Sequence, residues 1–256
     1  MNQSRLTDEA YWNNQYKVKN IGNVYRINTK TNLAVQELDN LFKRYLPVDE
    51  RLSFLEVGCA PGIWMEYFHK NFHYSVDGIE YTSSGYRATI RNLAKFKVEG
   101  KVYHQDFFEH SLGVDRYDVV FSGGFIEHFS EAEDVIKRHI DLLKPQGIAV
   151  IEIPNLGGWN GRLQQILNKE VYDKHNTKIM NLDFFKKVGL NMNLDCLFIG
   201  YVGRINMSLF HGPSIVNLML LVLQKLFTVS YFLFGRRFVN DSAQHSPFIV
   251  AIYRKK

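Results

Sequence analysis

The sequence has few cysteines and no long basic run, and each absence narrows the range of functions. Its two cysteines, Cys59 and Cys196, are too few for a disulfide framework or a cysteine metal cluster. The 31 basic and 26 acidic residues give a net charge of +5 that is spread along the chain, so nucleic acid binding is not expected. The first residues lack the apolar segment of a signal peptide, and we expect a cytoplasmic protein.

Long apolar runs are also scarce, with one exception at residues 215–234. Its length is close to the roughly 20 residues that span a bilayer. Polar residues interrupt it, and Lys225 near its middle would cost about 2.5–3.5 kcal/mol on insertion. We favour a buried helix or helical hairpin that covers a pocket. Peripheral contact with the inner face of a membrane is the main alternative, and a true span fits least well.

From about residue 50, short apolar runs alternate with helical patterns. Predicted strands cover 53–58, 75–80, 101–104, 117–121 and 147–153, and predicted helices cover 62–72, 84–96 and 131–143. This alternation predicts an α/β fold, with a parallel sheet that carries helices on both faces. A ligand would then lie outside the carboxyl ends of the first, second and fourth strands.

Further elements are predicted on both sides of this core. Helices over 7–17 and 31–46 precede it, and we expect residues 1–48 to form a lid. Thr7 or Asp8 would cap the first helix, whose aromatic rings either pack on the domain or close over a ligand; these rings are Tyr11, Trp12 and Tyr16. A turn is predicted at 21–23. After Pro154 we predict a flexible loop at 155–161, a helix at 182–188, and strands at 195–203 and 246–253. Without repeats or linkers, residues 1–256 are predicted to form one domain, with a core at 50–155 and acceptor-side elements at 156–256.

The most informative segment is the glycine-rich turn after the first predicted strand. Gly58 and Gly62 let the backbone approach a ligand closely, and Glu56 places a carboxylate two residues before Gly58. The dinucleotide pattern G-x-G-x-x-G fits poorly, because a carboxylate would repel a pyrophosphate. The same carboxylate would attract a positively charged ligand.

The run Glu56-Val57-Gly58-Cys59-Ala60-Pro61-Gly62 resembles motif I of class I S-adenosylmethionine-dependent methyltransferases, E/D-x-G-x-G-x-G, with Ala60 as the middle glycine. The resemblance continues in order through Glu80, Gln105-Asp106-Phe107, Ser122 to Phe129 and Leu142 to Gly147, and covers about residues 50–155. It implies a Rossmann-like, mostly parallel seven-stranded sheet with an antiparallel last strand. An N-terminal helical lid and a helical insertion before the last strand would complete this fold.

The resemblance implies S-adenosyl-L-methionine as cofactor and S-adenosyl-L-homocysteine as product. Glu80 would bind both ribose hydroxyls, Asp106 would accept from the adenine amino group, and Phe107 would pack on the ring. The other implied cofactor-binding residues are Glu56, Gly58, Cys59, Ala60, Gly62, Tyr81, Ser122 and Gly123. Arg26 is a further candidate, since a guanidinium binds a carboxylate in a bidentate way, although an arginine at such a position is usually a solvated surface charge. Purely structural alternatives are a solvated strand end for Glu56, a helix cap for Glu80 and a turn cap for Asp106. For Glu127 and His128 the alternative is the start of a surface helix, or a histidine that hydrogen-bonds the loop.

The candidate catalytic residues are His128 and Glu127. His128 would act as general base towards a hydroxyl, because its unperturbed pKa lies near operating pH; a carboxylate or phosphate acceptor would need no base. The pair resembles that of ubiquinone-pathway O-methyltransferases, but Gly124 stands where those carry a metal-binding Glu, and we predict no metal. The loop also resembles that of RNA ribose 2′-O-methyltransferases, yet Ser122 and Ile151-Glu152-Ile153 stand where that family needs an Asp and a Lys.

We therefore expect methyl transfer to a small molecule. The closing residues 246–255 resemble the last strand of methyltransferases found with cell-envelope sugar enzymes, which favours an oxygen of a sugar or cell-envelope precursor as acceptor. One alternative is a membrane-associated methyltransferase of a quinol or lipid-linked acceptor, which docks through residues 215–234. Another is an inactive regulatory subunit that binds the cofactor.

Overall fold

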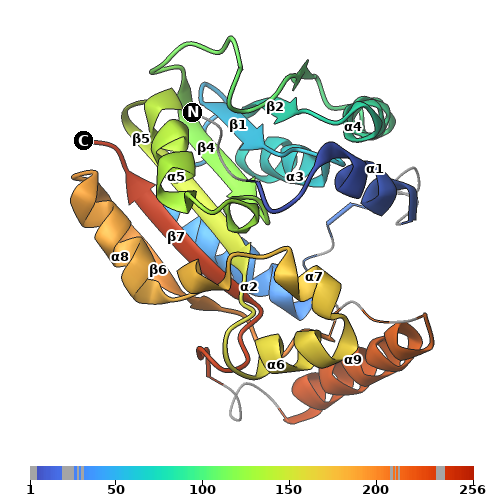
Figure 1. Ribbon diagram of the computed structural model, residues 1–256. Coiled ribbons are helices and arrows are strands. Elements are labelled where there is room, and N and C mark those ends of the chain that lie inside the picture. Colours follow the sequence, from blue (N-terminus) through green and yellow to red (C-terminus); the bar gives the residue numbers. More distant parts are fainter. Residues whose placement is uncertain are drawn as a thin grey trace.

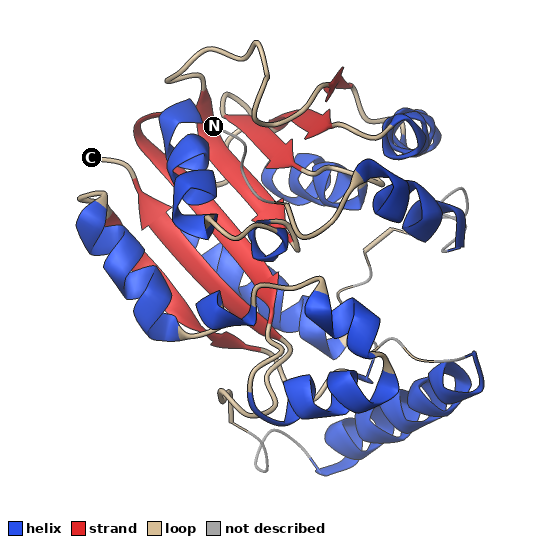
Figure 2. Cartoon of the chain, in the orientation of Figure 1, coloured by secondary structure: helices blue, strands red, loops and turns tan. Residues whose placement is uncertain are grey.

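The computed structural model describes residues 5–18, 26–27, 29, 32–207, 210, 212, 214–234 and 240–256. The turn predicted at 21–23 lies outside these residues. A central sheet carries helices on both faces, and the two-sided arrangement is visible in Figure 1 and, by element type, in Figure 2.

The sheet has seven strands in the order β3-β2-β1-β4-β5-β7-β6. Their bounds are β1 Ser53–Val57, β2 Ser75–Glu80, β3 Gly100–His104, β4 Tyr117–Gly123, β5 Leu143–Pro154, β6 Asp195–Val202 and β7 Phe248–Arg254. The first five strands run parallel, and β7 pairs antiparallel with both β5 and β6. The predicted Rossmann-like sheet with its antiparallel last strand is confirmed. Because β1 pairs with both β2 and β4, the loops after these three strands open at one edge.

Nine helices are described, with two short 3-10 turns. The helices are α1 Glu9–Val18, α2 Leu33–Tyr45, α3 Ile63–Phe72, α4 Ser83–Phe96, α5 Ala132–Leu142, α6 Gly158–Leu167, α7 Lys169–Asp173, α8 Leu182–Asn191 and α9 Ser214–Phe234, and the turns are η1 Ile126–His128 and η2 Thr177–Ile179. The predicted cap of the first helix is found at Asp8, whose side chain accepts from the Tyr11 amide at 2.7 Å.

Alternation along each strand divides the core into two apolar layers. Leu55 and Val120 point to the face covered by α5 and α8, whereas Phe54 and Phe121 point to the face covered by α2, α3 and α4. Phe42 of α2 lies in this second layer, with its ring centroid 6.0 Å from that of Phe121. α2 thus packs its apolar face under the sheet, and that residues 1–48 act as a lid stays a prediction.

Two predictions for the C-terminal part need correction. The loop expected at 155–161 gives way to α6 from Gly158 onward. The side-chain oxygen of Asn155 accepts a hydrogen bond from the Gly157 amide, and its side-chain amide donates to the Ser246 carbonyl, so the turn before the helix is fixed. Gly161 fits there because an added Cβ would stand 1.9 Å from the Leu156 carbonyl oxygen.

The apolar segment at 215–234 forms a single helix, α9, which lies at the margin of the molecule in Figure 1. The preferred expectation of a buried helix over a pocket is wrong, because Leu220 is buried while nine apolar side chains are exposed; these are Ile215, Leu218, Met219, Leu221, Val222, Leu223, Leu226, Phe227 and Val229. Within the described residues, no helix combines the length and apolarity that crossing a membrane requires.

Candidate active site

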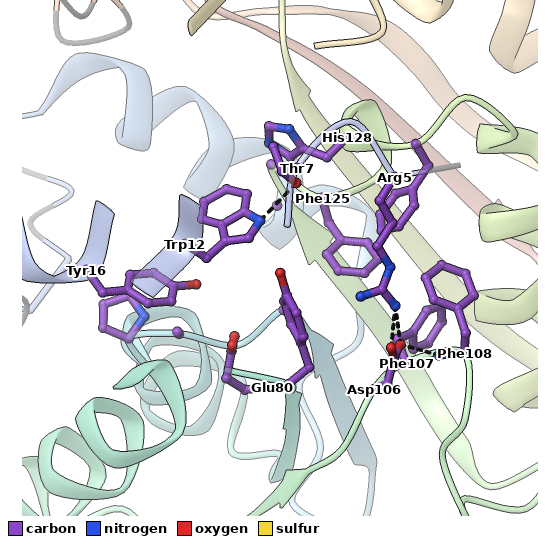
Figure 3. A pocket seen from close by; sticks show the side chains of 17 residues that line it. Arg5, Thr7, Trp12, Tyr16, Glu80, Asp106, Phe107, Phe108, Phe125 and His128 are labelled. Atoms are coloured by element: carbon purple, nitrogen blue, oxygen red, sulfur yellow. Dashed lines mark hydrogen bonds and ion pairs between the residues drawn. The ribbon is translucent and has the colours of Figure 1, made fainter. Parts of the chain in front are cut away.

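A cavity of about 280 Å³ lies at the carboxyl edge of the sheet, beneath the N-terminal segment (Figure 3). The loops after β1, β2, β3 and β4 contribute to its wall, and side chains from residues 5–16 close it. The lining residues are Arg5, Thr7, Trp12, Tyr16, Gly58, Ala60, Pro61, Glu80, Tyr81, Asp106, Phe107, Phe108, Gly123, Gly124, Phe125, His128 and Phe129. The cavity thus lies where the strand order predicted a ligand, with β3 as an additional contributor.

The loop after β1 presents backbone to the cavity. The amides of Gly58 and Cys59 both donate to the Ile79 carbonyl, at 3.0 and 3.1 Å, which holds the turn. Gly58 has φ +71°, and an added Cβ would stand 2.8 Å from Cδ2 of Phe125. Gly58, Ala60 and Pro61 line the cavity, whereas Cys59 is fully buried and Gly62 is the N-cap residue of α3, with φ +87°. Of the four loop residues predicted to bind the cofactor, Gly58 and Ala60 therefore lie in the wall, and Cys59 and Gly62 do not.

Glu56 lies behind the loop instead of in the cavity wall. Its carboxylate accepts a hydrogen bond from the Met65 amide at 3.0 Å, in the first turn of α3. A carboxylate at this position stabilises the positive end of the helix. Burial raises the pKa of Glu56 well above its usual range, despite that hydrogen bond. Its observed contact holds α3 against β1.

Glu80 reaches the cavity from the end of β2. Its Oε1 accepts from the amide and the hydroxyl of Thr82, at 2.7 and 2.6 Å. Thr82, and not Glu80, caps α4, since its hydroxyl accepts from the Gly85 amide. Burial raises the pKa of Glu80, although the Thr82 bonds oppose this. Tyr16 lies next to Glu80 in Figure 3, and burial together with Glu80 raises the pKa of its hydroxyl, which stays protonated.

Asp106 is engaged by a residue that sequence reasoning missed. The guanidinium of Arg5 pairs with both carboxylate oxygens, and Oδ1 also accepts from the Phe108 amide at 2.9 Å. Asp106 therefore also fulfils the turn-capping alternative. Phe107 is buried and packs against His139 and Phe125, with ring centroids 4.8 and 5.6 Å away.

Arg26 is not among the residues that line the cavity. Its Nε lies 2.9 Å from Oε1 of Glu66, and its guanidinium also donates to the Phe96 carbonyl. Glu66 lies on α3 and is buried, and a buried carboxylate needs a partner of opposite charge. Arg26 provides this partner. Arg5 is the arginine that reaches the cavity. Ser122 also stays behind the wall, fully buried, while Gly123 and Tyr81 line it.

His128 and Glu127 lie on η1, directly after β4. Nδ1 of His128 donates to the Lys174 carbonyl at 2.8 Å, and its ring meets that of Trp12 edge-on, with centroids 5.0 Å apart. Glu127 is not among the lining residues, and its Oε1 lies 3.6 Å from Nε2 of His128. Burial, with a smaller contribution from Glu152, raises the pKa of Glu127 well above its usual range.

His175 completes a cluster with this pair. Its Nδ1 donates to the Val171 carbonyl at 2.7 Å, and one ligand atom each from Glu127, His128 and His175 lies within 4.8 Å of the others. Two imidazoles and a carboxylate are a donor set that can hold a divalent cation. No sequence motif signalled His175, because it comes from the segment after α7. That no metal takes part stays a prediction.

The chain resembles known methyltransferases in sequence and in fold. The model of the methyltransferase-domain family matches residues 29–197. Phosphoethanolamine N-methyltransferase 2 of Haemonchus contortus, solved with phosphomonomethylethanolamine and S-adenosylhomocysteine, superposes with a TM-score of 0.61 at 16% identity, over 86% of this chain and 52% of that one. Geranyl diphosphate C-methyltransferase of Streptomyces coelicolor A3(2) gives 0.58 at 14% identity, over 87% and 79%.

A SAM-dependent methyltransferase from Archaeoglobus fulgidus gives a TM-score of 0.56 at 16% identity, over 86% of this chain and 94% of that one. Among curated proteins, no sequence matches. The family model covers more than half of the chain, and the structural neighbours share its fold. The chain therefore belongs to the methyltransferase-domain family, and it has the fold of S-adenosylmethionine-dependent methyltransferases.

Proposed function

We propose that this protein transfers a methyl group from S-adenosyl-L-methionine to an oxygen of a small acceptor, such as a sugar or a cell-envelope precursor. One observation carries the proposal: the same cavity is lined by Glu80, Asp106 and His128. The family resemblance assigns the first two to the ribose and the adenine. His128 has the chemistry of a base for the acceptor hydroxyl.

The residues present fit this cofactor. Gly58 lines the cavity, and the absence of a Cβ there makes room for the Phe125 ring, which lines the same wall. Glu80 and Asp106 offer acceptor oxygens for hydroxyl and amino donors. When bound, the cofactor supplies a methyl group that its sulfonium already activates. The chain has to bind and orient the reactants and keep water out, and the rings of Trp12 and Phe125 suit that task.

His128 would receive the proton of an acceptor hydroxyl. A carbonyl oxygen can only accept, so the contact with Lys174 fixes the proton on Nδ1. In the neutral ring Nε2 then carries the lone pair, which is the form a general base requires. Trp12 packs edge-on against this ring and limits its rotation.

The proposal is tested by transfer of labelled methyl groups to panels of nucleotide sugars, sugar phosphates and quinols. With a hydroxyl acceptor, His128→Ala is expected to lower turnover by about 10²- to 10⁴-fold at saturating acceptor. His69→Ala is the control, because His69 binds the Tyr74 carbonyl outside the cavity. Unchanged turnover in His128→Ala would remove it as the base. Tight binding of S-adenosylhomocysteine without transfer to any acceptor would favour the regulatory subunit.

The exposed surface of α9 supports a second candidate, a methyltransferase that acts at a membrane surface on a quinol or lipid-linked acceptor. Leu218 and Val222 lie one turn apart and are 62% and 52% exposed. Replacing both with Glu is expected to abolish flotation of the protein with anionic liposomes. Glu replacements at Val114 and Leu190, also exposed but on other elements, are the control. Failure of the wild-type protein to float would exclude this version.

A further inference from the structure

Arg5 occupies a slot between two aromatic rings at the cavity. Its guanidinium carbon lies 5.1 Å from the ring centroid of Tyr81 and 5.1 Å from that of Phe108. Its donors meet both oxygens of Asp106 (Figure 3). A guanidinium is planar and presents its N–H groups as a fork, which suits both ring stacking and a carboxylate.

These contacts are of the kind that an adenine ring would make. Adenine is also planar, stacks on aromatic rings, and offers an amino group to a carboxylate. Oδ1 of Asp106 already accepts from the Phe108 amide as well as from Arg5. The guanidinium and an adenine ring would therefore compete for the same carboxylate and the same space between Tyr81 and Phe108.

Arg5 is not an isolated side chain, because the strap, residues 5–12, is anchored across the cavity. The backbone of Arg5 forms an isolated antiparallel β-bridge with that of Phe129, and the Leu6 amide donates to the His128 carbonyl at 2.9 Å. The hydroxyl of Thr7 accepts from Nε1 of Trp12 at 3.0 Å. A displacement of Arg5 would consequently be transmitted to Thr7 and Trp12, which line the cavity beside His128.

We propose that Arg5 is an internal competitor of the cofactor, which holds the adenine seat closed and is released from Asp106 when the cofactor binds. The inference rests on the proposed cofactor site. Release of Arg5 loosens the strap and so couples cofactor binding to opening of the wall next to His128. The measured association constant of the cofactor then equals that of the open site multiplied by the fraction of protein in which Arg5 has left Asp106.

Calorimetry with S-adenosylhomocysteine and with adenosine tests this competition. Arg5→Ala is expected to bind both about 5- to 30-fold more tightly than the wild-type protein, since loss of a charged hydrogen-bonded contact of about 1–2 kcal/mol frees the seat. Arg5→Lys keeps the charge but lacks the forked N–H groups, so its affinity is expected to lie between those of the wild-type protein and Arg5→Ala. Arg51→Ala is the control, because Arg51 is an exposed partner of Asp49 and does not line the cavity.

A second readout reports the strap itself and needs no turnover. In a Trp64→Phe, Trp159→Phe background, Trp12 is the remaining tryptophan, and its emission should change when S-adenosylhomocysteine binds. With Arg5→Ala added, the ligand-free emission should already be shifted towards that of the complex. Constant Trp12 emission in all these states would overturn the coupling.

The calorimetric outcomes separate the inference from the function on which it rests. Unchanged or weaker binding by a folded Arg5→Ala would overturn the competition and, if weaker, would make Arg5 a direct cofactor ligand. No binding of S-adenosylhomocysteine by wild-type or variant protein would instead overturn the cofactor site, and the inference with it.

Discussion

The acid at the end of β5 gives a sharp test of the electrostatics beside the active site. Glu152 is buried, and Oε2 of its carboxyl lies next to Gly123, 3.0 Å from where a Cβ would be placed. Burial raises its pKa to about 8 from 4.5. The folded protein thus keeps a proton on Glu152 that the unfolded chain releases. The stability contributed by this proton is complete below about pH 4.5 and is lost as the pH rises through 8.

The magnitude follows from the two pKa values. One pH unit corresponds to about 1.4 kcal/mol, so the free energy of unfolding should fall by about 3.5 kcal/mol between pH 5 and pH 8 on account of Glu152. In Glu152→Gln this slope is absent, since an amide resembles the protonated acid and does not titrate. The variant should therefore gain stability relative to the wild type as the pH rises.

The measurement is urea denaturation of ligand-free protein at pH 5, 6, 7 and 8, followed by circular dichroism. The difference in unfolding free energy between variant and wild type is the quantity of interest, because groups common to both cancel. Glu50→Gln, at an exposed position, controls for loss of a carboxylate. A difference that is the same at pH 5 and pH 8 would refute a neutral Glu152 in the folded protein.

Two further predictions concern the cavity wall. Glu80→Ala is expected to weaken binding of S-adenosylhomocysteine by roughly 1–3 kcal/mol, or about 5- to 150-fold, through loss of acceptor oxygens, and unchanged calorimetric affinity would place the ribose elsewhere. Gly58→Ala is expected to lower the free energy of unfolding by about 1–3 kcal/mol, because φ is +71° and the added methyl would press on Phe125. Gly113→Ala, where nothing lies within 4 Å of a Cβ, should change stability little, and equal effects in the two variants would contradict this reasoning.

The parallel core could be predicted because its signals are local. Strands such as β4 and β5 contain short apolar runs bounded by glycine or polar residues, and motif residues at the carboxyl ends of the parallel strands must meet at one sheet edge. Glu80, Asp106 and His128 were found for this reason, and the structure places all three in the cavity.

What the sequence did not reveal depends on contacts between distant segments. Arg5 lies 101 positions before Asp106, and His175 lies in a segment without any periodic signal. Glu56 was assigned from its place in the motif and Arg26 from its chemistry, yet each has a structural partner, the Met65 amide and Glu66. Propensity likewise misjudged α6, whose start depends on Asn155.

The most direct test of the account is a crystal structure of the protein with S-adenosylhomocysteine. We predict the ribose hydroxyls on Glu80, the adenine between Tyr81 and Phe108 with its amino group on Asp106, and Arg5 displaced from that carboxylate. A ligand bound outside this cavity would contradict the proposed cofactor site. A ligand inside it, with Arg5 still paired to Asp106, would contradict the proposed competition.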